Sequence, residues 1–151
     1  MPKSVLNSNM VGFFGKLPST GDFVARGLPI GLRPFLDRWL TRNYASCIDG
    51  AEDWPLNGYR AIIKWGDSCL ILLILPSNDK LGRVFPLSIC RATRTVPDKQ
   101  SADVWCGTVL DLAKAAISNA MTADELLLAL EQIEETTLTS GNSLMGDLVW
   151  P

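Results

Sequence analysis

The densest cluster of polar side chains that could do chemistry occupies residues 76–83, Pro-Ser-Asn-Asp-Lys-Leu-Gly-Arg. Ser77, Asp79 and Lys80 could be imagined as a hydrolase set. No oxyanion-binding feature accompanies these three residues, so the pattern is weak evidence for catalysis. We therefore favour a structural loop in which Asp79 binds its own backbone or pairs with Arg83.

A second candidate is the segment 12–16, Gly-Phe-Phe-Gly-Lys, which superficially resembles a phosphate-binding loop. Such a loop needs the spacing G-x-x-x-x-G-K-[ST], because its backbone amides must wrap the anion before a helix begins. Here the glycines are closer together, Leu17 stands where the hydroxyl residue belongs, and Pro18 follows. We expect structural glycines rather than a nucleotide site.

The composition excludes several kinds of catalytic and metal site. The 151 residues include no histidine, so Ser-His-Asp triads, Cys-His dyads and His-ligated zinc are excluded. No two cysteines have the C-x-x-C spacing of zinc ribbons or thioredoxin-like motifs. The four cysteines are Cys47, Cys69, Cys90 and Cys106. We expect no catalytic residue, no metal and no cofactor, and a reducing cytoplasmic compartment.

The net charge of −2 gives no drive toward nucleic acid. The charge is uneven, because residues 1–99 carry 13 basic and 8 acidic side chains, whereas residues 100–151 carry 1 and 8. We expect these charges to lie on solvated faces of the protein, and the alternative is a charge asymmetry that faces a binding partner.

Residues 1–9 have no apolar signal core, and the longest apolar run, 69–75, is far shorter than the ~20 residues of a membrane span. We expect no membrane insertion.

Hydrophobic spacing predicts the elements that must position these residues. A short strand interrupted by glycines covers 11–17, and a turn covers 18–24. A helix runs over 29–48 and starts near Leu32, because Pro34 fits only its first turn. Strands follow at 59–65 and 68–75, the second apolar on both faces and therefore central. A third strand covers 82–92, where Pro86 indicates an edge, a bulge or a late start.

Two helices follow the strands. Ser101 is the expected cap of the first, which runs to about Asn119. Thr122 and Glu125 form a capping box for the second, over 123–136. We expect residues 144–151 to dock on the domain and residues 1–9 to be flexible. The chain is thus predicted to be one α+β domain of order β-α-β-β-β-α-α, with a mostly antiparallel sheet flanked by helices.

Two segments resemble the motifs of a known family. Residues 12–24, Gly-Phe-Phe-Gly-Lys-Leu-Pro-Ser-Thr-Gly-Asp-Phe-Val, resemble the opening motif of the TagF/ImpM family, accessory proteins of bacterial type VI secretion. Residues 75–87 resemble its second block, with Leu81 in place of the usual Val. Residues 34–39 are similar to its intervening helix. The resemblance covers most of 12–92, whereas 93–151 is similar only in being helical and looks short for the family.

The resemblance implies a non-enzymatic accessory protein that represses secretion after translation, through contact with the forkhead-associated scaffold or with inner-membrane base components. It implies a cytoplasmic protein, peripheral at the inner-membrane apparatus, with a longin- or profilin-like fold. Some relatives carry a fused phosphatase domain; this chain is too short to hold one and lacks its Asp-Gly metal motifs. The alternatives are a small hydrolase or nucleotide-binding enzyme that uses the 76–83 loop, and a structural component of the secretion base.

The matched motifs supply the candidate site. Candidates for partner binding or for locking the loops together are Lys16, Ser19, Asp22, Ser77, Asp79 and Arg83. Candidates for structural turns are Gly12, Gly15, Pro18, Gly21, Pro76, Gly82 and Pro86. We hypothesise that the two polar loops converge into one patch, through pairing of Asp22 or Asp79 with Arg83. The alternative is that this pairing only locks the loops.

Overall fold

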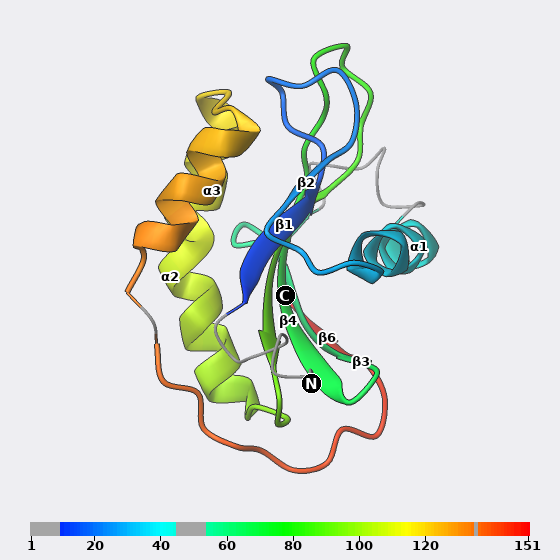
Figure 1. Ribbon diagram of the computed structural model, residues 1–151, viewed down its shortest axis with the longest axis vertical. Helices are drawn as coiled ribbons and strands as arrows, with labels where there is room; N and C mark the ends of the chain where they lie inside the picture. The colour runs from blue at the N-terminus through cyan, green and yellow to red at the C-terminus, as the bar shows by residue number, and fades with distance from the viewer. Residues whose placement is uncertain (1–9, 45–53, 135) are drawn as a thin grey trace.

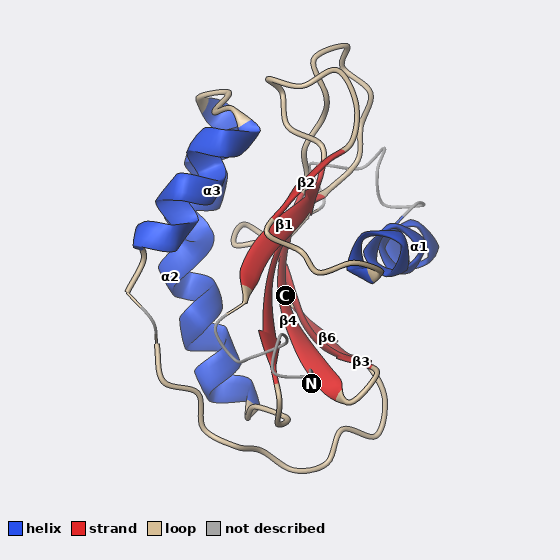
Figure 2. Cartoon of the chain, in the orientation of Figure 1, coloured by secondary structure: helices blue, strands red, loops and turns tan. Residues whose placement is uncertain are grey.

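The computed structural model describes residues 10–44, 54–134 and 136–151. The elements are β1 (Val11–Gly15), β2 (Val24–Arg26), α1 (Leu32–Tyr44), β3 (Tyr59–Trp65), β4 (Ser68–Leu75), β5 (Leu87–Thr93), α2 (Lys99–Ser118), α3 (Ala123–Gln132) and β6 (Leu148–Trp150). One antiparallel sheet has the strand order β2-β1-β5-β4-β3-β6. Helix α1 covers one face, and α2 with α3 covers the other (Figures 1 and 2). The predicted α+β class is confirmed; the likeness to longin or profilin folds stays a prediction.

The centre of the sheet is the meander β3-β4-β5. Gly66 adopts φ +60° in the tight turn between β3 and β4, so the two strands pair from Trp65↔Ser68 onward. Every residue of β4 is buried, which confirms the prediction of a central strand covered on both faces. Both strands have the predicted bounds, because a sharp turn and a continuous apolar run define them locally.

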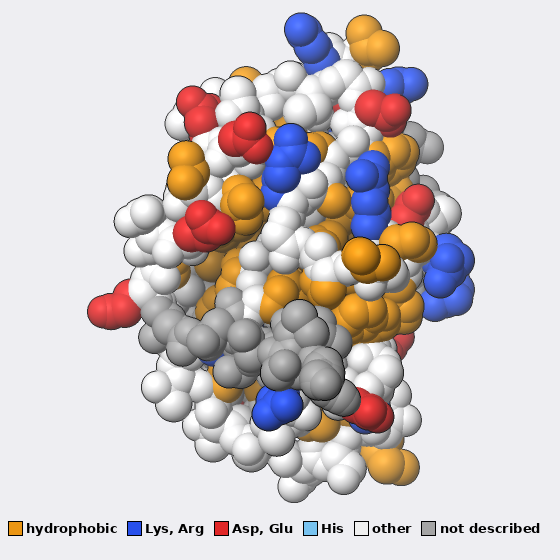
Figure 3. All heavy atoms as spheres, in the orientation of Figure 1, with side chains coloured by type: hydrophobic (Ala, Val, Ile, Leu, Met, Phe, Trp, Pro, Cys, Tyr) orange, Lys and Arg blue, Asp and Glu red, His pale blue; other side chains and the backbone are white. Residues whose placement is uncertain are grey.

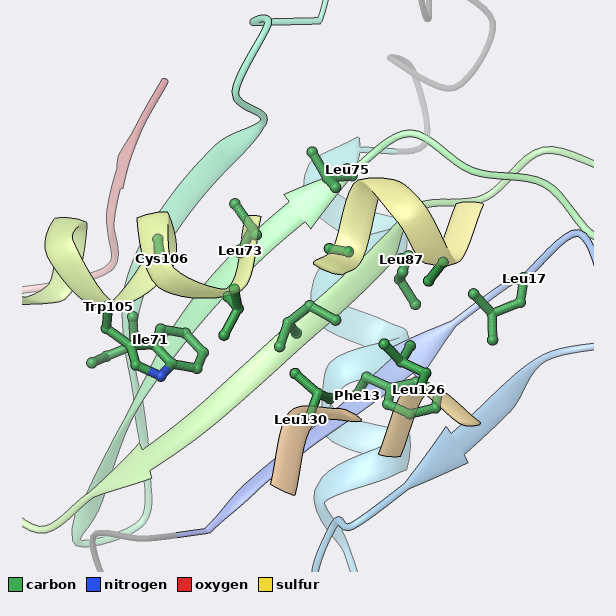
Figure 4. Close-up of a cluster of buried hydrophobic side chains, with 14 of the residues drawn as sticks. Phe13, Leu17, Ile71, Leu73, Leu75, Leu87, Trp105, Cys106, Leu126 and Leu130 are labelled. Atoms are coloured by element: carbon green, nitrogen blue, oxygen red, sulfur yellow. The ribbon is translucent and has the colours of Figure 1, made fainter. Parts of the chain in front are cut away.

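Two hydrophobic clusters sandwich the sheet. The cluster under α1 contains Leu32, Leu36, Trp39 and Leu40, whose spacing places them on one helical face. The cluster under α2 and α3 combines alternate residues of β1, β4 and β5 with one face of each helix (Figure 4). Its labelled members are Phe13, Leu17, Ile71, Leu73, Leu75, Leu87, Trp105, Cys106, Leu126 and Leu130. The sheet is therefore anchored on both faces, which fixes the loops that leave its ends.

Some predicted boundaries are wrong. The third strand of the meander begins at Leu87 rather than at residue 82. This is the late start that Pro86 indicated, because proline offers no N–H to a ladder. Val24 belongs to β2 and not to the preceding turn. The N-cap of α2 is Asp98, whose side chain accepts a hydrogen bond from the Ser101 N–H at 2.7 Å. Ser101, the predicted cap, therefore lies in the first turn of the helix. Residues 148–150 form an additional edge strand.

The capping box of α3 is confirmed, with Thr122 and Glu125 exchanging hydrogen bonds of 3.1 and 2.9 Å. This helix ends at Gln132, short of the predicted residue 136, since Ile133 is extended.

Three predictions concern residues that lie outside the described ranges. They are the flexibility of residues 1–9, the end of the first helix at 48 and the surroundings of Cys47. Within the described ranges, no helix combines the length and the hydropathy that crossing a bilayer requires.

Candidate functional site at the two-loop end

Two loops meet at one end of the sheet (Figure 1). Residues 16–23 connect β1 to β2, and residues 76–86 connect β4 to β5. Because β1 pairs antiparallel with β5, with Gly15 opposite Leu87, the first loop leaves the sheet beside the end of the second. The Lys80 N–H donates to the carbonyl oxygen of Thr20 at 2.6 Å and joins the loops directly. We call this region the two-loop end.

The carboxylate of Asp79 holds the second loop in shape. Its Oδ1 accepts the backbone N–H groups of Leu81 at 3.0 Å and Arg83 at 2.9 Å. Its Oδ2 accepts Arg83 Nε at 2.7 Å and lies 3.3 Å from Lys16 Nζ. The side chain is 0% exposed. Burial alone would raise the pKa of Asp79, but the hydrogen bonds from Arg83, Lys16 and Leu81 outweigh it and lower that pKa to about 2.

Further bonds connect the first loop to the second. Arg83 Nη2 donates to the carbonyl oxygen of Gly21 at 2.7 Å, and the buried Ser77 hydroxyl donates to that of Lys16 at 2.7 Å. With the Lys16–Asp79 ion pair, four predicted site residues thus meet, drawn from both motifs. From the sequence, either Asp22 or Asp79 was the expected partner of Arg83, and the structure pairs Arg83 with Asp79.

The other two predicted site residues lie apart from this network. Asp22 is exposed, and its Oδ1 accepts the N–H of its neighbour Phe23 at 2.7 Å. Among the described residues it forms no ion pair with Arg83. The Ser19 hydroxyl donates to the carbonyl oxygen of Met121 at 2.6 Å, which ties the first loop to the α2–α3 connection.

An aromatic cluster supports the ionic network. Phe14 and Phe23 stack with ring centroids 5.7 Å apart, and Phe85 meets Phe23 edge-on at 4.9 Å. Lys16 Nζ lies 4.7 Å from the centroid of the Phe23 ring, so the same ammonium contacts both the carboxylate and the aromatic cluster. These phenylalanines belong to the two matched motifs, yet sequence reasoning did not include them in the site.

Gly12 and Gly15 lie inside β1, as the strand predicted over 11–17 requires, and not in a turn as their place among the turn candidates implied. At Gly15, which has φ +145°, an added Cβ would collide with the carbonyl oxygen of Pro86. At Gly12, an added Cβ would collide with that of Arg26. Both glycines therefore permit close approach of neighbouring backbone. Of the remaining turn candidates, Pro18, Gly21, Pro76, Gly82 and Pro86 all lie in the two loops.

The tip of the two-loop end is exposed and mixed in character. Leu81 is 73% and Val84 40% exposed, beside exposed Lys80 and Asp22. Figure 3 shows hydrophobic, basic and acidic side chains close together at this end. Sequence reasoning missed Leu81 and Val84; the available signal was apolar residues within an otherwise polar loop.

The geometry does not favour acid–base or nucleophilic chemistry by these residues. The Ser77 hydroxyl is buried and donates to a carbonyl, and Asp79 is ionised and held by four donors, so neither is poised for proton transfer.

The cysteines are also poor nucleophiles, because the reactive form is the thiolate. Burial raises the pKa of Cys69 and Cys90, and it raises the pKa of Cys106 to about 12. Within the described ranges, no three His, Cys, Asp or Glu residues are grouped to hold a metal ion.

Comparison with known families matches residues 12–133 to the family model described as the TagF N-terminal domain, type VI secretion system-associated. Among solved structures, the chain is similar to PA0076 from Pseudomonas aeruginosa PAO1, with 26% sequence identity and a TM-score of 0.69. The alignment covers 89% of this chain and 68% of that chain. No curated protein matches the chain.

Proposed function

The chain belongs to the type VI secretion-associated TagF N-terminal domain family, and from that membership we propose that it is a non-enzymatic accessory protein that represses secretion after translation. It acts by binding another protein of the secretion system. The proposed partners are the forkhead-associated scaffold and cytoplasm-facing components of the inner-membrane base. The protein works in the cytoplasm, at the periphery of that apparatus.

The observation that supports this proposal is that the polar residues around Asp79 are used to fix the two loops, which leaves the exposed side chains of the same end free for contact. Lys16, Ser77 and Asp79 are buried, and together with Arg83 they lock the loops. A loop fixed before binding loses little conformational entropy when a partner docks. The motif residues thus hold a shape rather than react.

The proposed contact residues are the exposed members of the same end. Leu81 and Val84 supply apolar area, and Asp22 and Lys80 supply charges at its rim. Apolar contacts surrounded by polar groups are typical of protein interfaces. Ser19, bonded to Met121, keeps this end in register with the helices.

Secretion by the native bacterium tests the repressor role. We expect deletion of the protein to raise export of the secreted tube protein, and the wild-type chain to restore repression. Leu81→Asp should fail to restore it while its thermal unfolding matches that of the wild type. Leu128→Asp is the matched control, because Leu128 is also an exposed leucine, 60% accessible, on α3.

Two outcomes would contradict the proposal. Secretion abolished by deletion would indicate a structural component of the secretion base. Full repression by a stable, well-expressed Leu81→Asp variant would separate the repressor role from the two-loop end.

A further inference from the structure

We infer that a cavity at the end of β5 binds a phosphate monoester between two arginine side chains. The cavity has a volume of about 400 Å³, which is within the range of small-molecule sites. Its lining residues lie within 93–97 and 136–138, together with Arg91, and we call it the β5-end cavity. Strand β5 begins beside the two-loop end and ends at this cavity, so the inference does not depend on the proposed repressor role.

The two walls of the β5-end cavity are joined on both sides of it. On one side, the Gly141 N–H donates to the carbonyl oxygen of Val96 at 2.7 Å. On the other side, Arg91 Nη1 donates to the carbonyl oxygen of Thr136 at 3.0 Å. These two bonds fix the distance between the walls, so the cavity is a built part of the fold.

Arg91 places a positive charge at the buried side of the cavity. Leu87 and Ile89, which alternate with it along β5, belong to the hydrophobic cluster under α2 and α3. Arg91 is only 4% exposed, and its Nη1 also donates to the hydroxyl oxygen of Thr136 at 3.2 Å. A guanidinium that is bonded to neutral oxygens keeps its full charge, and burial strengthens its attraction for an anion.

Arg94 supplies a second positive charge from the exposed side of the same cavity. Among the described residues, Arg94 enters no ion pair, and no Asp or Glu lines the cavity. The exposed hydroxyl groups of Thr95 and Thr137 form no hydrogen bond within the described chain, so both can donate to a ligand. Two guanidinium groups that face one cavity attract an oxyanion between them.

The donor set fits a phosphate group better than a carboxylate. A phosphate monoester carries close to two negative charges at neutral pH and three acceptor oxygens, which match two arginines and two hydroxyl groups. A phosphate ion alone would leave most of the 400 Å³ empty, so there is room for the organic group of an ester. Phosphorylated metabolites and phosphorylated protein side chains share this chemistry.

Titration of the isotope-labelled full chain, followed by NMR, tests the inference. The first probe is inorganic phosphate, added against chloride at constant ionic strength. We expect saturable shifts of the Thr95 and Thr137 amide signals. Arg94→Ala should weaken binding at least tenfold, because it removes the charge at the exposed side. Arg38→Ala is the matched control, since Arg38 is an exposed arginine on α1, and it should bind like the wild type. Circular dichroism verifies that both variants are folded.

Two esters distinguish the sources of the phosphate group. Glycerol 3-phosphate represents a metabolite, and the tripeptide Gly-phosphoserine-Gly represents a protein side chain. We expect at least one of them to bind more tightly than inorganic phosphate, and the tighter one identifies the source. Three results would overturn the inference: no saturable shift in the wild type, equal effects of Arg94→Ala and Arg38→Ala, or neither ester binding more tightly than inorganic phosphate.

Discussion

Asp79 and Arg83 face each other across a turn, with Nε and Oδ2 2.7 Å apart, and Arg83 extends the contact to the carbonyl oxygen of Gly21 in the neighbouring loop. One exposed arginine thereby couples a fully buried carboxylate to a loop 62 residues away in sequence. The geometry of the two-loop end depends on this relationship.

Removing the Asp79 charge should loosen both loops. In Asp79→Asn, the Lys16 ammonium and the Arg83 guanidinium lose their carboxylate, and an amide cannot accept all four donors. We expect the melting temperature to fall by roughly 5 °C or more. Differential scanning calorimetry measures this, with Asp22→Asn as the exposed control. Equal melting temperatures for both variants would contradict the locking role.

Acid should act on the same carboxylate. The pKa of Asp79 in the folded state, about 2, is below its ordinary value of 3.8, so the unfolded state binds the proton more readily. The stability contributed by Asp79 is present above pH 4 and is lost as the pH falls toward 2. Urea unfolding between pH 6 and 2 should show a smaller loss for Asp79→Asn than for the wild type. Parallel curves would contradict the assignment.

The close approach of β1 to the second loop should not tolerate a side chain. Gly15→Ala places a Cβ against the Pro86 carbonyl at φ +145°, and the strained backbone alone costs about 1–3 kcal/mol. Gly21→Ala is the matched control, because a Cβ there meets no atom within 4 Å, and the expected change is within about 0.5 kcal/mol. Chemical denaturation measures both, and a neutral Gly15→Ala would refute the steric argument.

Local patterns predicted the hairpin of β3 and β4 well and the elements around it less well. The bounds of β4 follow from one sharp turn and one continuous apolar run, and the same turn fixes the end of β3. The three-residue β6 escaped prediction because its pairing with β3 depends on contacts across the whole fold. Asp98 and Ser101 are both good caps, and local sequence could not choose between them.

The same distinction holds for the two-loop end. The Asp79–Arg83 pair, four residues apart, was one of two pairings considered from sequence. The ion pair of Lys16 with Asp79 requires the register of β1 against β5, which sequence spacing does not reveal. The exposure of Leu81 was missed because apolar residues are ordinarily expected inside, although its place in an otherwise polar loop was an available signal.

The most direct test of the central claim, that the locked two-loop end contacts the secretion machinery, is site-specific photo-crosslinking in living cells. A photoreactive residue replaces Leu81 in one strain and Leu128 in the other. We predict that position 81 forms a covalent adduct with a type VI secretion protein and that position 128 does not. Adducts from position 128 alone, or from neither position in a strain that represses normally, would contradict the account.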